Sequence, residues 1–410
     1  MKNVIVIAFR NLFRNKRRTI LTSSLITFGV VLVVAFGGLA ISFKSQMVGV
    51  LTNTAMGDLQ IHRTGYVESI DNLPLNLTMS GADLAHVERV LKSMPDVAAF
   101  SPRIKFGAMI SNYAQTSNIR LSAVYPEMEN PTVPEFVKRI KGTVSDPDRF
   151  LRPGEILVPE NLMKGLSLKQ GDDIVLVATN KEGSVNAVTL RIAAVTENVF
   201  GPSGKDGYIH IQDAQALLRM EQPEIVEIAI HLKRFDALSR VAASLKGESA
   251  VRKLPVEVHT WEQLSPFASI ARIVDLLIIV VKVILVSIVI VSILNIMTMS
   301  VYERISEIGT IAAIGTPPRR ILALFLVEGF AMGLLSTIAG IGIGLGILWI
   351  MNLTRIEFAF GQMNVSLAPS IPAGEIVWVA LVVMLASLFA GLQPAYKASK
   401  MEPVDALGHV

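Results

Sequence analysis

The chain contains 410 residues, of which 51% are hydrophobic and 18% are charged, and its formal net charge is +4 at pH 7. This hydrophobic content is too high for a soluble protein of this length and indicates a membrane protein with a separate aqueous part. The absence of cysteine excludes disulfides, thiolate metal sites and cysteine nucleophiles.

The N-terminal segment, residues 1–18, is predicted to form a cytoplasmic amphipathic helix. Its apolar face carries Ile5, Phe9, Leu12 and Phe13, and its basic face carries Arg10, Arg14, Arg17 and Arg18. Such a helix lies on the inner leaflet, with a simple topology anchor as the alternative. The basic residues then face anionic lipid, which argues against nucleic acid as a partner, and the positive-inside rule places the N-terminus in the cytoplasm.

Four uncharged apolar stretches follow, at residues 19–43, 283–302, 329–354 and 376–396. Each has the roughly 20 residues that a helix needs to cross a bilayer. We assign transmembrane helices to residues 19–43, 268–302, 321–354 and 376–396. The second includes a stalk above the bilayer, for which a surface loop is the alternative. A cleaved signal peptide is the alternative for the first, because Gly38-Leu39-Ala40 offers a small-residue cleavage site.

An even number of spans places the tail, residues 397–410, in the cytoplasm and the polar block, residues 44–267, outside. The predicted fold is therefore an α-helical membrane protein with four transmembrane helices and a large α+β extracytoplasmic domain inserted between the first two.

The polar block repeats a strand-helix-strand pattern. Strands are predicted at residues 57–62, 104–111, 118–124, 225–232 and 256–258. Ser80 with Asp83 is predicted to open a helix that runs to Met94, and a second helix is predicted at residues 236–246. We expect one α/β layer from residues 44–126 and 223–267. A β-rich subdomain, residues 127–222, interrupts it, with apolar runs at residues 156–158, 174–178, 188–195 and 208–211 and a short helix at residues 214–220.

A short charged segment, residues 303–318, separates the second and third spans. Ile305, Ile308, Ile311 and Ala312 form an apolar stripe, with Glu303, Arg304 and Glu307 off it. Gly315 is predicted to end this helix, and Thr316-Pro317 to begin the next. The pattern predicts a short, rigid helix on the cytoplasmic side.

Three sequence tracts carry a family resemblance. They are Glu303-Arg304-x-x-Glu307-Ile308-Gly309-x-x-x-Ala313-x-Gly315, Pro394-Ala395-x-x-Ala398-Ser399 with Pro403-x-x-Ala406-Leu407, and Arg10-Asn11-Leu12-x-Arg14-Asn15-x-x-Arg17-Arg18-Thr19. Together with the order of the spans, they resemble the FtsX-like permeases, which include MacB-type efflux permeases and lipoprotein-releasing LolC and LolE permeases. The polar block resembles the MacB-type periplasmic core domain.

The resemblance implies an ABC transporter permease of the bacterial inner membrane. In that family, residues 303–318 correspond to a coupling helix that docks on a cytoplasmic ABC ATPase, which assigns ATPase coupling to Glu303, Arg304, Glu307, Gly309 and Gly315. The sequence lacks Gly-x-x-x-x-Gly-Lys-Ser/Thr, and residues 201–206 match it with the wrong spacing. We therefore expect the ATP to be used by a separate ATPase subunit, with no cofactor bound directly by this chain.

Two ionisable residues lie near span ends. Lys282 is expected to reach the outer headgroups, and Glu328 to pair with Arg14, Arg17 or Arg18. Gly340, Gly342, Gly344 and Gly346 form two offset Gly-x-x-x-Gly pairs, which predict close helix packing, with hinging as the alternative. The six histidines have no metal-ligand spacing, so the sequence predicts no catalytic, cofactor or metal residues.

These features predict a permease subunit of a mechanotransmitting, type VII ABC transporter. Two copies, or this chain and a sister permease, would pair with two ATPase subunits and move lipoprotein or lipid out of the inner membrane. Residues 57–62 and the tract Val124-x-Pro126-Glu127-x-Glu129 resemble lipoprotein-releasing relatives. One alternative is MacB-like efflux of peptides or small molecules with an adaptor and outer-membrane channel. The other is an FtsX-like regulator of a cell-wall hydrolase.

Overall fold

The computed structural model describes residue 10 and residues 16–142, 146–197, 204–264, 268–354, 356–360 and 363–401. Most of the predicted amphipathic helix, residues 1–9 and 11–15, and the tail, residues 402–410, lie outside this range. The chain forms two compact units. The helical unit contains the described residues up to Gln46 and from Ala271 onward, and the α+β unit is Met47–Ile270.

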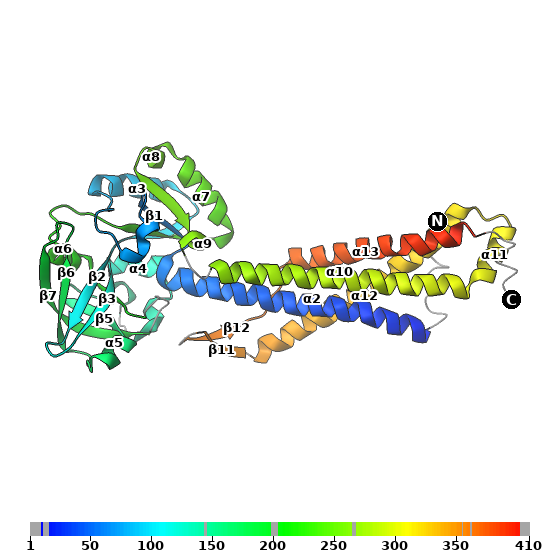
Figure 1. The fold of residues 1–410 in the computed structure, drawn as a ribbon, viewed down its shortest axis with the longest axis horizontal. Coiled ribbons are helices and arrows are strands. Elements are labelled where there is room, and N and C mark those ends of the chain that lie inside the picture. The colour runs from blue at the N-terminus through cyan, green and yellow to red at the C-terminus, as the bar shows by residue number, and fades with distance from the viewer. Residues whose placement is uncertain are drawn as a thin grey trace. The chain divides into compact units, whose positions relative to one another are not determined.

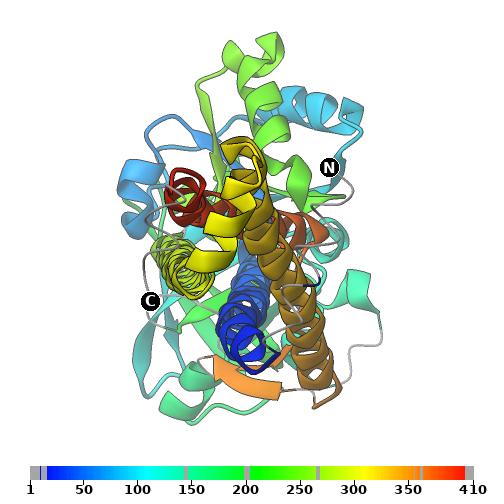
Figure 2. The same cartoon turned by 90° about the vertical axis from the view of Figure 1, so that its right-hand side faces the viewer.

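Four long helices build the helical unit (Figures 1 and 2). They are α2 (Lys16–Leu51), α10 (Ala268–Glu303), α12 (Pro318–Thr354) and α13 (Ala373–Ser399). All four are long and apolar enough to cross a membrane, which confirms the predicted number of spans. A helix of 36 residues, the length of α2 and of α10, is about 54 Å long and exceeds a ~30 Å hydrocarbon core.

Apolar side chains, most of them aliphatic, fill the core between the four helices. Val30 of α2, Val289 of α10, Phe325 of α12 and Val383 of α13 all belong to one buried cluster. Between α12 and α13, β11 (Ile356–Phe360) and β12 (Met363–Leu367) form a hairpin for which we had predicted no element. The segment Met363–Leu367 alternates apolar and polar residues, which is the pattern of a strand, whereas Ile356–Phe360 has Glu357 as its one polar residue.

The first part of the α+β unit is an antiparallel layer in the order β10-β1-β9-β2. Its strands are β1 (Leu59–Arg63), β2 (Val97–Ser111), β9 (Glu227–Leu232) and β10 (Val256–Thr260). Helices α3 (Gly81–Ser93) and α7 (Leu238–Gly247) contact this layer, and α8 (Ser249–Arg252) and α9 (Trp261–Leu264) are short. Ser80 and Asp83 form a reciprocal capping box at the start of α3, at the residues that predicted its beginning.

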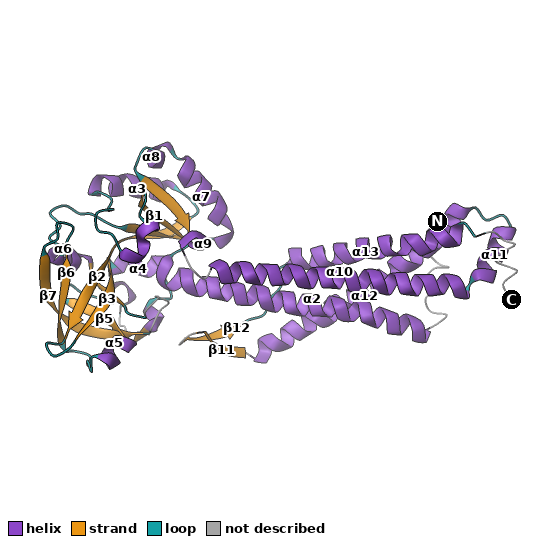
Figure 3. Cartoon of the chain, in the orientation of Figure 1, coloured by secondary structure: helices purple, strands orange, loops and turns teal. Residues whose placement is uncertain are grey.

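The second part is a closed barrel. Strand pairing runs β2-β3-β8-β5-β7-β6 and returns to β2. Figure 3 draws the strands in orange and labels β2, β3, β5, β6 and β7. The added strands are β3 (Thr116–Val124), β5 (Glu155–Pro159), β6 (Asp173–Thr179), β7 (Val185–Thr196) and β8 (Asp206–His210), with β4 (Ile140–Lys141) beside β7. The accompanying helices are α4 (Pro126–Thr132), α5 (Glu160–Gly165) and α6 (Ile211–Leu217). Closure satisfies the backbone groups that an open sheet would leave at its edges.

The boundary between layer and barrel differs from the expected one. Sequence analysis began the inserted subdomain at residue 127, whereas β2 already changes partners after Arg103. Val97–Arg103 pair with β9, and Ile104–Ser111 pair with β3. The side chains of Ile104, Phe106 and Ile110 enter the barrel core, so the barrel draws in residues that we had assigned to the layer.

Candidate functional site

The segment between α10 and α12 contains a short helix between two breaks. Helix α10 ends at Glu303, and Arg304 has non-helical angles of φ −113° and ψ 19°. Helix α11 (Ile305–Ala313) follows, and Gly315 has φ +90°. The expected coupling helix, residues 303–318, is therefore a helix of nine residues with a defined break at each end.

Gly315 ends α11 as its position in the sequence predicts. The Gly315 N–H donates to the Ala312 carbonyl at 2.9 Å, and the Thr316 N–H donates to the Ile311 carbonyl at 3.2 Å. These two bonds form a Schellman motif, whose left-handed residue favours glycine. Helix α12 begins at Pro318, so this residue, and not Pro317, occupies the first helical position.

Helix α11 has one face in the bundle and one face exposed. Ile308 is 4% exposed and belongs to the bundle core, whereas Ile311 and Ile314 are 41% and 80% exposed. The exposed face of α11 also carries Glu307, and Glu303, the last residue of α10, is exposed as well. The predicted apolar stripe is thus divided: Ile308 packs inward, whereas two isoleucines and two carboxylates of this segment lie at the surface.

Arg304 does not belong to this outer surface. Its side chain is 13% exposed, and its Nη1 lies 3.3 Å from Oε2 of Glu328 in α12, which is 4% exposed. We had expected Arg304 at the docking surface, and nothing in the sequence indicated its pair with Glu328. The expected pairing of Glu328 with Arg14, Arg17 or Arg18 stays a prediction, because Arg14 and the side chain of Arg18 lie outside the described part of the chain. The contact joins the break between α10 and α11 to α12.

The other charged residue near a span end, Lys282, lies 2.6 Å from Glu375 in the first turn of α13. This ion pair provides a partner within the chain for a side chain that we expected to reach the headgroups. Lys44 of α2 similarly lies 2.7 Å from Asp275 of α10. Ion pairs therefore connect α10 to α2 and to α13, and the residue after its C-terminus to α12.

The four glycines of α12 divide into two pairs. A Cβ added to Gly340 would lie 2.6 Å from Cβ of Val30, and one added to Gly344 would lie 2.7 Å from Cγ1 of Val34. A Cβ on Gly342 or Gly346 would meet no atom within 4 Å. Gly340 and Gly344 therefore face α2 at close approach, while the offset pair lies against no other part of the described chain.

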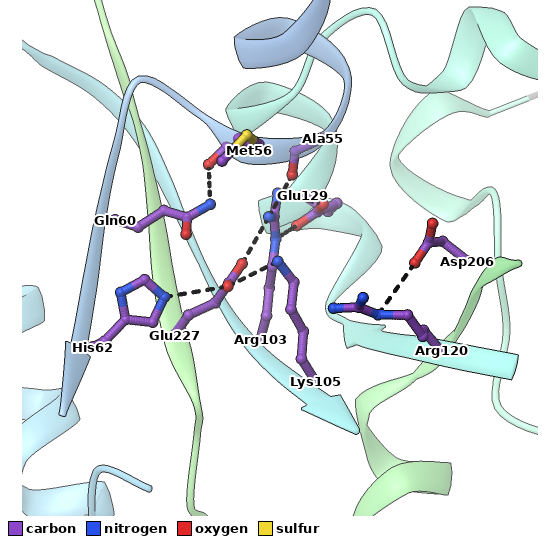
Figure 4. Close-up of polar contacts among 10 residues, drawn as sticks. All are labelled: Ala55, Met56, Gln60, His62, Arg103, Lys105, Arg120, Glu129, Asp206 and Glu227. Carbon is purple, nitrogen blue, oxygen red and sulfur yellow. Dashed lines mark hydrogen bonds and ion pairs between the residues drawn. The ribbon is translucent and has the colours of Figure 1, made fainter. Parts of the chain in front are cut away.

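A buried charge cluster in the α+β unit was not anticipated. Arg103, Glu129, Glu227 and His62 each have side chains no more than 1% exposed, and Lys105 is 25% exposed. Figure 4 shows three basic side chains around the Glu227 carboxylate: Arg103 Nη1 at 3.0 Å, Lys105 Nζ at 2.8 Å and His62 Nε2 at 3.5 Å. Glu227 lies within an apolar run, residues 225–232. An acidic residue in such a run was the one local feature of the sequence that could have indicated a buried charge.

Both central charges are stabilised in the folded unit. Burial opposes ionisation of Glu227, but the charge of Lys105, the hydrogen bond with His62 and the charge of Arg103 outweigh it and hold the pKa of this carboxyl well below its usual range. Burial also opposes the charge of Arg103, whose pKa is nevertheless raised by Glu129 and Glu227. Glu227 and Arg103 are therefore both ionised at neutral pH. Among the described residues, no group of three or more acidic or histidine side chains could hold a metal ion.

Comparison with known proteins identifies both parts of the chain. Residues 279–403 match the family model of the FtsX-like permease C-terminal domain, and residues 19–248 match that of the MacB-like periplasmic core domain. The second match alone covers more than half of the chain.

Individual relatives share little sequence. The lipoprotein-releasing system transmembrane protein LolC of Neisseria meningitidis is 21% identical over 400 residues, covering 93% of this chain and 92% of LolC. LolE of Haemophilus influenzae is 24% identical, covering 78% of this chain and 80% of LolE. The macrolide export ATP-binding/permease protein MacB of Vibrio parahaemolyticus is 34% identical over 113 residues, which are 28% of this chain and 16% of MacB.

The family resemblance noted in the sequence is thereby confirmed. The chain belongs to the FtsX-like permeases with a MacB-like periplasmic core domain, which are ABC transporter permeases of the LolC/LolE and MacB type.

Proposed function

We propose that this permease converts ATP hydrolysis in a cytoplasmic ABC ATPase into movement of its α+β unit outside the inner membrane. That movement would transfer lipoprotein or lipid out of the membrane. The observation that carries the proposal is α11, a short helix held between two breaks. The helix exposes Glu307 and Ile311, and the residues that flank it, Glu303 and Ile314, are exposed too. An amphipathic outer face of this kind suits docking into a partner's groove.

A separate ATPase subunit is favoured by how much of each relative the chain covers. The chain spans 92% of LolC, whose name describes a transmembrane protein of a releasing system. Its match to MacB, named as an ATP-binding/permease protein, covers 16% of that protein. We therefore propose that the ATPase is a partner, and that two permeases, either two copies or this chain and a sister permease, assemble with two ATPase subunits.

The connections around α11 provide a route for force. Helix α10 continues into α11 through Arg304, and the Arg304–Glu328 ion pair ties this junction to α12. Displacement of α11 by the ATPase would therefore shift α10 and α12 together. The chain passes between its two units within α2 and within α10, so both routes into the α+β unit are helical.

The composition of the bundle favours relay over passage of substrate between the helices. The shared core of α2, α10, α12 and α13 is mainly apolar, and the uncharged polar side chains buried in it are serines and threonines such as Ser292, Thr337 and Ser387. Lys44, Lys282 and Arg304 are each paired with an acidic residue of the described bundle. Substrate handling is therefore assigned to the α+β unit, with a lipoprotein carrier or an adaptor as its partner there.

Lipoprotein or lipid is the proposed substrate because the LolC and LolE relatives extend over most of the chain. Export of small molecules with an adaptor and outer-membrane channel is the second candidate, favoured by the 34% identity to MacB over a shorter segment.

The docking surface is tested by charge reversal. We expect Glu303→Lys with Glu307→Lys to reduce ATPase co-purification, and permease-dependent ATP turnover in nanodiscs, by about tenfold, because reversed charges at an interface repel a complementary partner. Glu248→Lys, at an exposed residue of the α+β unit, is the matched control. Wild-type association and turnover in the double variant would reject α11 as the docking element. Mass spectrometry of the wild-type complex identifies the partner beforehand.

A further inference from the structure

We propose that Arg103 is a positioning residue that locks the end of the first transmembrane helix to both the layer and the barrel, so that the two move as one body. The inference rests on the function proposed above and adds the point at which force enters the α+β unit.

The position of Arg103 in the fold is the first reason. It is the last residue of β2 that pairs with the layer, directly opposite Glu227 of β9. The next residue, Ile104, pairs with Ala123 of the barrel strand β3. The side chain therefore starts at the point where the chain passes from the layer to the barrel.

The three directions of its contacts are the second reason. Nε and Nη2 lie 2.9 Å and 2.7 Å from the two carboxylate oxygens of Glu129 in α4, the helix that follows β3. Nη1 donates to Glu227 Oε1 at 3.0 Å and to the backbone carbonyl of Ala55 at 2.6 Å (Figure 4). A guanidinium is a rigid planar fork, so it fixes the mutual geometry of all three partners.

The contact with Ala55 connects Arg103 to the end of the first transmembrane helix. Ala55 belongs to the π-helical turn η1 (Thr52–Met56), which directly continues α2. The carbonyls at a helix end carry partial negative charge, and Arg103 places its positive charge on one of them. Gln60 Nε2 donates to the next carbonyl, that of Met56, at 2.7 Å, so β1 and β2 both hold the end of the helix.

The turn after this helix end has no room to shift. Gly57 has φ +71°, and a Cβ there would lie 2.8 Å from the Ile230 carbonyl oxygen of β9. The Asp58 N–H also donates to that carbonyl at 2.8 Å. The chain leaving η1 is thus fixed against the layer directly behind the Arg103 contact.

The chemistry of the cluster favours positioning over stability. A buried ion-pair network costs desolvation, and apolar residues of similar volume hold a core equally well. Directional bonds specify one arrangement of α2, layer and barrel, whereas an apolar contact tolerates sliding. The network is suited to transmitting displacement without slippage.

The experiment measures nucleotide-driven motion in the full chain with its ATPase in nanodiscs. Because the sequence has no cysteine, single cysteines for spin labels can be added directly. Suitable exposed positions are Asn352 on α12, Lys169 in the barrel segment and Lys246 on α7 of the layer. Helix α12 lies outside the lock, so in the wild type we expect ATP and vanadate to change the Asn352–Lys169 and Asn352–Lys246 distances together.

The test variant is the neutral triple substitution Arg103→Met, Glu129→Gln and Glu227→Gln, which leaves no uncompensated charge from this trio. We expect its melting temperature to stay within about 5 °C of the wild type and its ATP turnover within about twofold, while transport falls about tenfold. The nucleotide-driven change in at least one label distance should disappear. The control, Arg191→Met with Asp173→Asn, removes an exposed barrel ion pair and should leave every readout unchanged.

Wild-type distance changes and transport in the triple variant would overturn the proposal. If the triple variant does not fold, the single variant Arg103→Lys provides the test, because lysine keeps the positive charge and lacks the planar guanidinium. Wild-type distance changes and transport in this variant would overturn the proposal. Their loss in a folded Arg103→Lys protein would support it. A wild-type complex that hydrolyses ATP without any distance change would refute the proposed function as well, which separates the two failures.

Discussion

Arg304 lies at the single non-helical position between α10 and α11, and its side chain joins that position to Glu328 of α12. Both side chains are largely withdrawn from the surface, at 13% and 4% exposed. Removing one partner of such a pair leaves a buried charge without compensation, which is costly. The pair therefore specifies the angle at which α11 meets the bundle, while Glu303 and Glu307 remain on the exposed face.

Charge reversal tests this role. Arg304→Glu and Glu328→Arg are each expected to destabilise the chain by about 3 kcal/mol and to reduce ATP-driven transport, because each places like charges together. The double variant should recover most of the lost stability, as measured by thermal unfolding in nanodiscs. Arg319→Glu, at an exposed residue near the start of α12, is the control. Additive losses in the double variant would show that the two side chains do not interact.

At the scale of elements, local signals predicted local structure. The capping pair Ser80 and Asp83 located the start of α3, and Gly315 located the end of α11, because both effects act within a few residues. The four apolar stretches gave four helices, although the helices extend beyond the uncharged segments. Hydrogen bonding continues along a helix after its residues become polar, so composition underestimated their length.

Long-range pairing was beyond the sequence pattern. The change of partners along β2 depends on β9, which is more than a hundred residues away, and the strand itself shows no break at Arg103. The buried cluster combines side chains from β1, β2, α4 and β9 for the same reason. The two Gly-x-x-x-Gly pairs looked equivalent in sequence, and only the position of α2 distinguishes them.

The glycine pairs of α12 predict opposite effects of one substitution. Gly340→Ala would place a methyl group 2.6 Å from Val30, and we expect a loss of about 1–3 kcal/mol from overpacking. Gly342→Ala meets no neighbour and should gain up to about 1 kcal/mol, because alanine favours a helix more than glycine. Thermal unfolding of the two variants in the same nanodiscs provides the comparison. Changes of the same sign would contradict the packing of α12 on α2.

At the scale of the whole molecule, the order of the elements along the chain determines how force could pass from α11 to the α+β unit. Helix α10 leaves the α+β unit at its N-terminal end and reaches α11 at its C-terminal end. If α10 crosses the membrane, the α+β unit and α11 lie on opposite sides of it. Force applied at α11 then reaches the other side along α10, and the ion pair between Lys44 and Asp275 lets α2 take part.

Single cysteines test this topology directly, because the wild-type chain has none and supplies an unlabelled control. Lys169→Cys in the α+β unit should react with a membrane-impermeant maleimide in intact spheroplasts. Lys400→Cys, just after α13, should react only after the membrane is opened. Both residues are exposed, so a difference in labelling reports the side of the membrane. Equal labelling of both in intact spheroplasts would place the α+β unit and the end of α13 on the same side of the membrane, which would contradict a relay of force across it.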